Sequence, residues 1–544
     1  MKDSKSNLNF PDAGYSGIYL VLALLTTVFL VKLVQSLGWR LQFDTAIMHY
    51  VAYLINEHSF APYRDIFEIN MPGSYLVHMA VGKMFGYSDL AFRMADVTWL
   101  VATLTVTWLI MMPAGRVAAW ASCLLFGLLY LGAGPYMGFQ RDFLAILPMA
   151  IALLIATQRR PWYSSKLIHF LLGVLFALAT LIKPHMVIGL PVLVVYSCIQ
   201  GGYDSKSAGK LMKACIVGGF FALFGLSLAL AIPLLWLWKV GSIYSFWEIL
   251  SSYLPLYLQM DLDHSFVDSS SRFKQSLMLY LDFGGFAVLL MSSIFSVCYI
   301  WVRPLFVELR KLAILLLLST IIYSIYVAIG GRFLPYHWIP YIYFACLCTG
   351  LILASPLTGN LNNSFKVIFP LFAFIFIVMV TVKPAEAVLQ LPGSVLQLMH
   401  GHLPPAPPPK NGRVDEIAAY LNMNLSTTDR VQPLDWDGGA LHGMLLAKAI
   451  TATPYICDFQ LYHHVSTPYI QGLRRDFLAD LEQATPAFII DMHEKTKVTG
   501  IDTTSDFPEL EAFIEKHYSK DYGGNGFDIL KRSIFKEERN KPSQ

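Results

Sequence analysis

Long apolar runs separated by short polar turns make up most of the first 399 residues. A helix that crosses a bilayer needs roughly 20 predominantly apolar residues. The sequence therefore predicts a polytopic α-helical membrane protein with about eleven spans. The predicted spans lie at residues 16–38, 89–112, 117–133, 143–157, 167–182, 186–199, 214–238, 277–302, 312–329, 336–354 and 367–382.

Two segments between the first and second spans have a different pattern. Thr45–Asn56 repeats apolar residues with the period of a helix, which predicts an amphipathic helix lying at the membrane surface. Gly73–Phe85 is apolar but short, and it contains His78 and Lys83. It is predicted to be a juxtamembrane helix or the start of the second span.

The pattern changes again at residues 400–410, a proline-rich linker that cannot continue a helix. Beyond it, helix-like and strand-like stretches alternate, which predicts a small α/β domain over residues 411–544. The expected helices are 413–425, 438–450, 468–484 and 507–519, and the expected strands are 430–434, 487–491 and 527–535. The chain thus divides into a transmembrane domain, residues 1–399 with a first outer loop at 39–88, the linker, and a C-terminal domain.

Composition agrees with this division. Hydrophobic residues make up 55% of the 544 positions and charged residues only 14%, far below the charged fraction of a soluble domain. Of the 77 charged residues, 35 lie in residues 400–544. The net charge of +3 is too small and dispersed to indicate nucleic acid as a partner. The seven cysteines form no recognisable disulfide framework or metal site.

Lysine and arginine in the short loops predict the orientation. With the N-terminus in the cytoplasm, the basic turns all fall on the inside and the C-terminal domain falls outside. These inner basic residues are Arg116, Arg159, Arg160, Lys166, Lys206, Lys210, Lys213, Arg303, Arg310, Lys311 and Lys366. A bacterial inner membrane with a periplasmic C-terminal domain is the expected location, and an endoplasmic reticulum membrane with a lumenal domain would give the same pattern.

The first outer loop carries the most informative motifs. An acid, Asp44, opens it; Pro62-Tyr-Arg-Asp-Ile-Phe-Glu-Ile-Asn-Met-Pro72 follows, and Phe85-Gly-Tyr-Ser-Asp-Leu-Ala-Phe-Arg93 leads into the second span. This order resembles the polyprenyl-phosphate-sugar-dependent membrane glycosyltransferases of the GT-C class, especially the protein O-mannosyltransferase and lipid A aminoarabinose transferase branch. Relatives commonly have an acid followed directly by Lys-Pro, whereas this chain has Glu68-Ile-Asn-Met-Pro72.

Asp44 has two interpretations. Aspartate is a favoured helix N-cap and its charge suits the helix dipole, so Asp44 could simply begin the surface helix. The resemblance instead implies that Asp44 is the general base of the transfer. It also implies that Glu68 and Asp142 orient the acceptor or the base.

Two further outer turns match the same family. Gln140-Arg-Asp142 resembles its second acid, although Arg141 and Asp142 could form an ordinary surface pair. Charged groups at the mouth of a span are more often functional, which favours the first interpretation. Lys183-Pro-His185 resembles the turn whose lysine faces the donor phosphate, and the alternative is that Lys183 only snorkels to the headgroup region.

The outer turn Gly330-Gly-Arg-Phe-Leu-Pro-Tyr-His-Trp-Ile-Pro340 completes the resemblance. It looks like the family's arginine- and tyrosine-containing segment before a late span. Arg332 and Tyr336 can donate hydrogen bonds to a phosphate, and His337 could add a third donor. The aromatic residues of this turn could also be an ordinary interfacial belt.

The remaining candidates are weaker. Arg64, Asp65, Arg141 and Arg272 are further polar candidates for the outer site. An acidic loop, Asp261, Asp263, His264 and Asp268, could hold a divalent cation, Mg²⁺ or Mn²⁺, but solvated acidic loops are far commoner than metal sites. No other cofactor is indicated. His463 and His464 are expected to be surface residues.

The resemblance implies an integral membrane glycosyltransferase that moves a sugar from a polyprenyl-phosphate donor to an extracytoplasmic acceptor. The acceptor could be a glycolipid, a glycan or a protein, and the work would belong to cell-envelope biogenesis such as lipopolysaccharide modification. A lipid or glycolipid transporter or flippase is the alternative, since many spans and buried charges also suit that class. In a transporter or flippase, however, the functional charged residues would be expected near the middle of the membrane.

Overall fold

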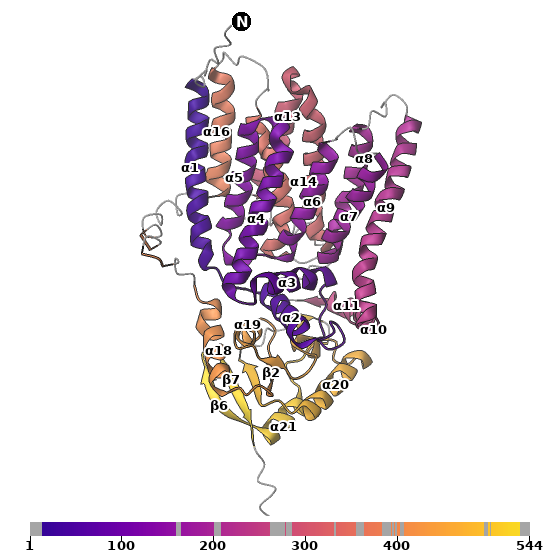
Figure 1. The fold of residues 1–544 in the computed structure, drawn as a ribbon, viewed down its shortest axis with the longest axis vertical. Coiled ribbons are helices and arrows are strands. Elements are labelled where there is room, and N and C mark those ends of the chain that lie inside the picture. The colour runs from indigo at the N-terminus through magenta and orange to yellow at the C-terminus, as the bar shows by residue number, and fades with distance from the viewer. Residues whose placement is uncertain are drawn as a thin grey trace, which may run out of the picture.

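A computed structural model describes most of the chain. The described residues are 13–158, 165–200, 208–261, 278, 286–330, 333–354, 364–382, 393, 396–397, 400–402, 407–493, 499–500 and 502–533. Within them the protein has a long helical bundle at one end and a smaller mixed domain at the other (Figure 1).

Each of the eleven predicted spans coincides with a helix of the bundle. These helices are α1 (Ala13–Gln35), α4 (Asp89–Met111), α5 (Arg116–Gly132), α6 (Arg141–Thr157), α7 (Ser165–Ile182), α8 (Leu190–Gln200), α9 (Ala208–Lys239), α13 (Phe286–Val302), α14 (Arg310–Gly330), α15 (Ile339–Gly350) and α16 (Ser364–Thr381). Among the described residues, six helical segments are long and apolar enough to cross a bilayer, and shorter apolar helices lie beside them. The prediction of a polytopic helical membrane protein is confirmed.

Glycines bring two of the spans into close contact. A Cβ atom at Gly173 of α7 would lie 1.8 Å from the backbone oxygen of Ala222 in α9. A Cβ atom at Gly225 of α9 would lie 2.2 Å from the backbone oxygen of Phe170. Apolar side chains gain little free energy when they leave lipid for another helix, so membrane helices associate mainly through close van der Waals packing. Small residues allow this packing because they let the two backbones approach closely. Any larger residue at either position would push these helices apart.

A layer of short helices separates the bundle from the C-terminal domain (Figure 1). It contains α2 (Asp44–His58), α3 (Pro72–Phe85), α10 (Ile243–Glu248), a π-helical turn (Ile249–Tyr253) and α11 (Leu254–Tyr257). The helix predicted for Thr45–Asn56 is therefore present as α2, but it does not have one face open to the membrane surface, since all residues from Thr45 to Leu54 are buried where α2 packs against α3 and α19 (Ala440–Leu446). The segment Gly73–Phe85 is a separate helix, α3, because Gly86, with φ of 87°, ends it before α4 begins.

The C-terminal domain has a five-stranded sheet in the order β3-β2-β4-β7-β6. Its strands are β2 (Arg430–Leu434), β3 (Ile450–Thr451), β4 (Phe488–Met492), β6 (Tyr518–Gly524) and β7 (Phe527–Arg532). Strands β3, β2 and β4 are parallel, and β7 and β6 add antiparallel to β4. Its helices are α18 (Arg413–Asn424), α19 (Ala440–Leu446), α20 (Pro468–Ala484) and α21 (Pro508–His517). The predicted α/β character is confirmed. The additional strands are β3, β6 and β5 (Thr499–Gly500), and β5 pairs antiparallel with β1 (Met260–Asp261).

Ion pairs and hydrogen bonds join this domain to the layer of short helices and to the end of the first span. Arg40, just after the first span, pairs with Asp89 at 2.6 Å and with Asp415 at 2.8 Å. Tyr50 and Tyr53 of α2 donate to backbone oxygens of residues 449 and 448, at 3.0 and 2.9 Å. The apolar core of the C-terminal domain is continuous with that of α2 and α3. The domain is therefore packed on the bundle.

The expectation that His463 and His464 are surface residues is wrong. Both are buried, and the Nε2 atom of His463 lies 3.0 Å from the hydroxyl of Tyr253, which belongs to the layer of short helices between the bundle and the C-terminal domain. Burial lowers the pKa of His463 to about 3, with a further contribution from His464. His463 and His464 are buried because their loop forms part of the contact between the C-terminal domain and this layer of short helices.

A fully buried ion pair fixes the start of α4. Arg93 contacts Asp96 and the Ser36 hydroxyl, and neither member of the ion pair is exposed to solvent. Asp96 also accepts from the Tyr130 hydroxyl at 2.5 Å and from the Phe139 amide at 3.2 Å. Arg93 belongs to the motif that leads into the second span, and here it ties three spans to the loop before α6.

Candidate active site

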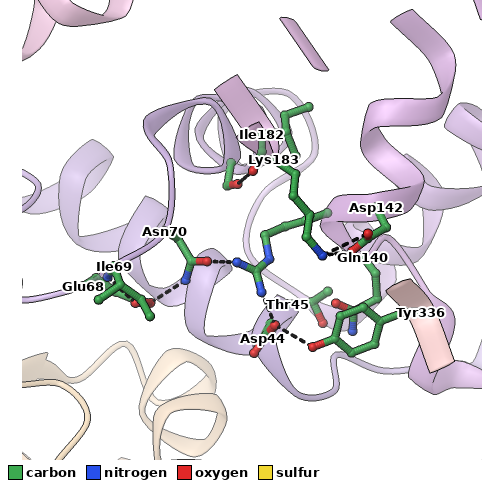
Figure 2. A network of polar contacts seen from close by, with 12 residues as sticks. Asp44, Thr45, Glu68, Ile69, Asn70, Gln140, Asp142, Ile182, Lys183 and Tyr336 are labelled. Atoms are coloured by element: carbon green, nitrogen blue, oxygen red, sulfur yellow. Dashed lines mark hydrogen bonds and ion pairs between the residues drawn. The ribbon is translucent and has the colours of Figure 1, made fainter. Parts of the chain in front are cut away.

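Four polar segments meet at the end of the bundle that faces the C-terminal domain. They are Asp44 at the start of α2, Arg141 and Asp142 at the start of α6, Lys183 between α7 and the turn Pro184–Gly189, and Tyr336 in the turn Pro335–Trp338. Figure 2 shows Asp44, Asp142, Lys183 and Tyr336 converging from elements that are far apart in sequence. The sequence predicted all of these residues but could not show that they meet.

Asp44 accepts two strong hydrogen bonds through one carboxylate oxygen. Its Oδ2 atom lies 2.5 Å from Nη2 of Arg141 and 3.0 Å from the Tyr336 hydroxyl (Figure 2). Among the described residues, no partner contacts Oδ1, which leaves one oxygen for another ligand. The N-cap residue of α2 is Phe43 and Asp44 is the first residue of the helix, so Asp44 is not the N-cap, although its charge lies in the first turn, where the helix dipole favours an acid.

The backbone before Asp44 is strained. Phe43 has φ of 51° and ψ of −138°, a backbone conformation that residues other than glycine rarely adopt. Such residues cost roughly 1–3 kcal/mol and gather at functional sites. The Phe43 ring packs edge-on against Tyr136 at 4.3 Å and under the Lys410 ammonium at 4.6 Å. These contacts hold the turn that aims Asp44 at Arg141.

Electrostatics keep Asp44 ionised. Burial alone would raise the pKa of Asp44, but the positive charge of Arg141 and the hydrogen bond from Tyr336 outweigh burial and hold the pKa below its usual range. The opposite holds for Glu68, whose pKa is raised by burial despite hydrogen bonds from Ile69 and Asn70. Asp44 is therefore an anion at neutral pH, and Glu68 is the more easily protonated of the two acids.

A chain of hydrogen bonds connects Glu68 to Asp44. Glu68 accepts from the Ile69 amide at 2.7 Å and from the Asn70 side chain at 2.8 Å. The side-chain oxygen of Asn70 accepts from Nη1 of Arg141, whose Nη2 binds Asp44 (Figure 2). Glu68 thus acts on Asp44 through two intermediates. Asn70, which occupies the region where relatives commonly have lysine, was not predicted from the sequence.

Asp142 pairs with Lys183, so its interpretation as a surface pair with Arg141 is wrong. The Lys183 ammonium lies 2.7 and 2.9 Å from the two Asp142 oxygens, and the carboxylate of Asp142 is fully buried. Tyr326, which the sequence did not single out, donates to Asp142 at 2.5 Å. Burial lowers the pKa of Lys183 to about 8, although Asp142 opposes this shift. An ammonium has three donors, and two of them are directed at Asp142.

Aromatic rings enclose the site beside Asp44. The rings of Tyr136 and Tyr336 are 5.4 Å apart, and Tyr336 packs edge-on against His337 at 4.7 Å. Tyr336 and His337 are both buried. Their burial argues against an interfacial aromatic belt at this turn, because belt residues are partly exposed to headgroups.

The C-terminal domain reaches the same site. Lys410, whose ammonium covers the Phe43 ring, pairs with Asp437 at 3.1 Å. Asp437 follows strand β2, and burial raises its pKa to about 7, with Lys410 opposing and Asp435 adding to the shift. These residues lie in a linker and a loop whose sequence pattern indicates no function. Only the docking of the domain shows that they border Asp44.

Other candidates lie away from this site or outside the described residues. Arg64 and Asp65 pair with each other at 2.8 Å, and Arg64 also donates to the backbone oxygen of Val240 at the end of α9. Arg272, Asp263, His264, Asp268 and Arg332 lie outside the described residues, as does the side chain of Asp261. Within the described part of the chain, no group of three metal-ligating side chains is present.

Comparison with known proteins gives structural matches only. No family model and no curated protein matches the sequence. The structure of ArnT from Cupriavidus metallidurans bound to undecaprenyl phosphate matches with a TM-score of 0.55 and 14% identity, over 95% of this chain and 98% of that chain. Two structures of the Archaeoglobus fulgidus oligosaccharyltransferase, one tethered to an acceptor peptide and one in the apo form, match with TM-scores of 0.44 and 0.46 and identities of 11% and 12%. They cover 88% of this chain and 69% and 70% of theirs.

The match to ArnT extends over both the bundle and the C-terminal domain. It shows that the chain has the fold of this ArnT structure. The fold implied by the resemblance in the first outer loop is therefore confirmed.

Proposed function

We propose that the protein is a membrane glycosyltransferase that moves a sugar from a polyprenyl-phosphate donor to an acceptor hydroxyl. The observation that carries this proposal is the convergence of an ionised carboxylate, Asp44, and a partly buried lysine, Lys183, at one end of the bundle. Such a site offers a base for the acceptor and a cation for the leaving phosphate. The match to a structure with bound undecaprenyl phosphate supports a lipid-linked donor.

In this proposal Asp44 is the base. The acceptor hydroxyl donates to the Oδ1 atom of Asp44 and its oxygen attacks the anomeric carbon. The bond from that carbon to the phosphate oxygen breaks, and the polyprenyl phosphate leaves with the electron pair. The hydroxyl proton passes to Asp44, and the anomeric configuration inverts because attack and departure occur on opposite faces. Arg141, held by Asn70 and Glu68, fixes the carboxylate for this step.

Lys183 and Tyr336 stabilise the departing phosphate in the same proposal. Negative charge grows on the phosphate as the sugar becomes oxocarbenium-like, so fixed donors aimed at it lower the barrier. The third N–H of Lys183 is available for this contact, and Asp142 orients the ammonium. Arg332 and His337 are proposed as further donors from the turn that holds Tyr336.

The position of the charges disfavours a transporter. The described residues of the site lie at one end of the bundle, next to the C-terminal domain, and not near its middle (Figures 1 and 2). Transporters of the common repeat types bind their substrates near the membrane midplane.

The direct test is transfer of sugar from a polyprenyl-phosphate donor to envelope acceptors by the purified protein in detergent. Donor binding without any turnover across a panel of glycolipid, glycan and protein acceptors would contradict the proposal.

Donor affinity should depend on pH through Lys183. Its cationic form predominates below its pKa of about 8, and the phosphodiester of a polyprenyl-phosphate sugar does not titrate in this range, so the affinity for that donor should be constant below this pH. Above it, the dissociation constant should rise toward tenfold per pH unit, because binding must then be accompanied by proton uptake. The measurement is a fluorescence or scintillation binding assay between pH 6.5 and 9.5.

Lys183→Arg is the matched control, since arginine stays protonated throughout this range. Its affinity should be independent of pH. Lys183→Ala should weaken binding by on the order of 1–3 kcal/mol, the value of a charge-assisted hydrogen bond. A wild-type profile that is flat to pH 9.5, with unchanged affinity in Lys183→Ala, would assign Lys183 to structure alone.

We also propose that the N-terminus is cytoplasmic and that the C-terminal domain lies outside, in the periplasm of a bacterial inner membrane. The basic inner loops support this orientation. A variant without native cysteines and with a new cysteine at exposed Ser426 should react with an impermeant thiol reagent in intact spheroplasts. A matched variant with its cysteine at exposed Lys210, at the far end of α9, should react only after lysis. The reverse pattern would invert the topology.

A further inference from the structure

A second hollow lies at the same end of the bundle, away from the active site. It has a volume of about 440 Å³, is open on one side, and is lined by the C-terminal end of α2, by the loop that follows it, by α3 and by the end of α9. Its lining combines apolar side chains, among them Phe60, Met79 and Trp236, with the polar groups of Asn56, Ser59, Arg64 and Lys83. Cavities of this size accommodate small-molecule ligands or lipid headgroups.

The hollow has one cation without a matching acid. Arg64 and Lys83 are the charged residues among its described lining residues, but Asp65, which does not line the hollow, pairs with Arg64 and matches its charge, so Lys83 carries the unmatched charge. Arg64 uses three N–H groups on Asp65 and on the Val240 backbone, which leaves two of its five for a ligand. Lys83 is exposed, and in the described part of the chain no carboxylate pairs with it. The Lys83 ammonium and the two remaining N–H groups of Arg64 are therefore the donors that the hollow offers to an anion.

The hollow lies at the level where lipid headgroups are found. The apolar helix α9 ends at Lys239, next to the lining residues Trp236 and Val240. Trp238, Tyr244 and Trp247 follow with exposed fractions of 69%, 86% and 67%. Exposed tryptophan and tyrosine at the end of a span mark the interface between hydrocarbon and water. Phosphate groups of lipids lie at this depth.

The hollow is separate from the proposed transfer site. Asn56 is twelve residues after Asp44 along α2, which corresponds to about 18 Å at 1.5 Å per residue. Neither Asp44 nor Lys183 lines it. Arg64, a candidate in the first outer loop, therefore belongs to this hollow and not to the site around Asp44.

We propose that this hollow binds the phosphate of an anionic membrane lipid, with Lys83 and Arg64 holding the phosphate. The apolar part of the lining, Phe60, Met79 and Trp236, then contacts the glycerol and the first carbons of the chains. An anionic headgroup is favoured because Lys83 has no carboxylate partner among the described residues, and the described lining residues include no acid to match the ammonium of a zwitterionic lipid. The inference does not depend on the activity proposed for Asp44.

The test is retention of phosphatidylglycerol by the full-length protein. Protein in mixed micelles of phosphatidylglycerol and phosphatidylcholine is analysed by native mass spectrometry. The wild type should keep phosphatidylglycerol in preference, and Lys83→Gln should weaken its retention roughly tenfold, as expected for the loss of one charge-assisted contact. Lys83→Arg should restore retention, because it keeps the charge.

Two control variants distinguish binding in this hollow from general surface attraction and from binding at the transfer site. Lys239→Gln removes the same charge beside the hollow but outside its lining, and it should leave retention unchanged. Equal losses in Lys239→Gln and Lys83→Gln would mean general surface attraction and would overturn the proposal. Lys183→Gln should also leave retention unchanged, whereas a loss there alone would move the lipid to the transfer site.

A free anion is distinguished from a lipid by competition. Inorganic phosphate in large excess should not displace phosphatidylglycerol, because the lipid also contacts the apolar lining. Displacement by inorganic phosphate would assign the hollow to a soluble anion and overturn the lipid assignment. Equal retention of phosphatidylcholine and phosphatidylglycerol by the wild type would overturn the charge argument as well.

Discussion

Asp44→Asn is expected to slow sugar transfer by roughly 10²–10⁴-fold while donor binding survives. Asparagine has nearly the same size, and its oxygen can still accept the hydrogen bonds from Arg141 and Tyr336. It cannot accept a proton from the acceptor. Because Asp44 caps no helix, the change should leave α2 in place. The measurement is turnover under saturating donor, alongside donor affinity and thermal stability in detergent.

Asn70→Ala is the informative companion to this variant. It removes the link between Glu68 and Arg141 but leaves Asp44 able to take a proton. We expect a smaller loss of turnover than in Asp44→Asn. Near-normal turnover in a folded Asp44→Asn protein would exclude Asp44 as the base and leave Glu68 or Asp142 as candidates.

Arg93→Met is expected to give the largest loss of stability, roughly 3–5 kcal/mol. The change leaves the Asp96 carboxylate in a fully buried position without its ion-pair partner. The cost arises because a buried charge that loses its counter-charge is neither solvated nor paired. The measurement is the unfolding midpoint of the purified protein in detergent, followed by tryptophan fluorescence or size-exclusion chromatography after heating.

The double variant Arg93→Met, Asp96→Asn separates pairing from packing. Asparagine is neutral and can still accept from Tyr130 and the Phe139 amide. The double variant should therefore be more stable than Arg93→Met alone. If both proteins unfold at the same temperature, the loss comes from the Arg93 side chain itself, whose guanidinium stacks on the Trp39 ring at 4.5 Å.

The linear pattern was enough to predict the helices of this protein. Apolar length and period depend on each segment alone, so the eleven spans, α2 and the alternation of the C-terminal domain followed from it. The boundary between α3 and α4 was less certain, because it depends on the conformation of one glycine, Gly86, between two apolar stretches. The short strand β3 and the strand β6 also escaped, since the pattern of β6 is largely polar.

The candidate site was predictable as a set of residues but not as a set of contacts. Asp44, Asp142, Lys183 and Tyr336 were all recognisable, because charged or polar groups at the ends of apolar spans are costly and stand out. Their pairing was not recognisable. Arg141 looked like the partner of its neighbour Asp142, yet the start of α6 directs the two side chains to Asp44 and Lys183 respectively.

Sequence alone determined the class of the protein, its division into a bundle and a polar domain, and the order of its outer motifs. Tertiary structure decided the rest: that His463 and His464 are buried, that Lys410 and Asp437 border Asp44, and that Arg64 lines a different hollow. The physical reason is the range of the interactions. Spans and strands follow from the pattern of apolar and polar residues within one segment, because that pattern sets the free energy of moving the segment out of water. Each ion pair of the site instead joins segments that are far apart in sequence, and the distance between them is fixed only when the helices and the C-terminal domain pack.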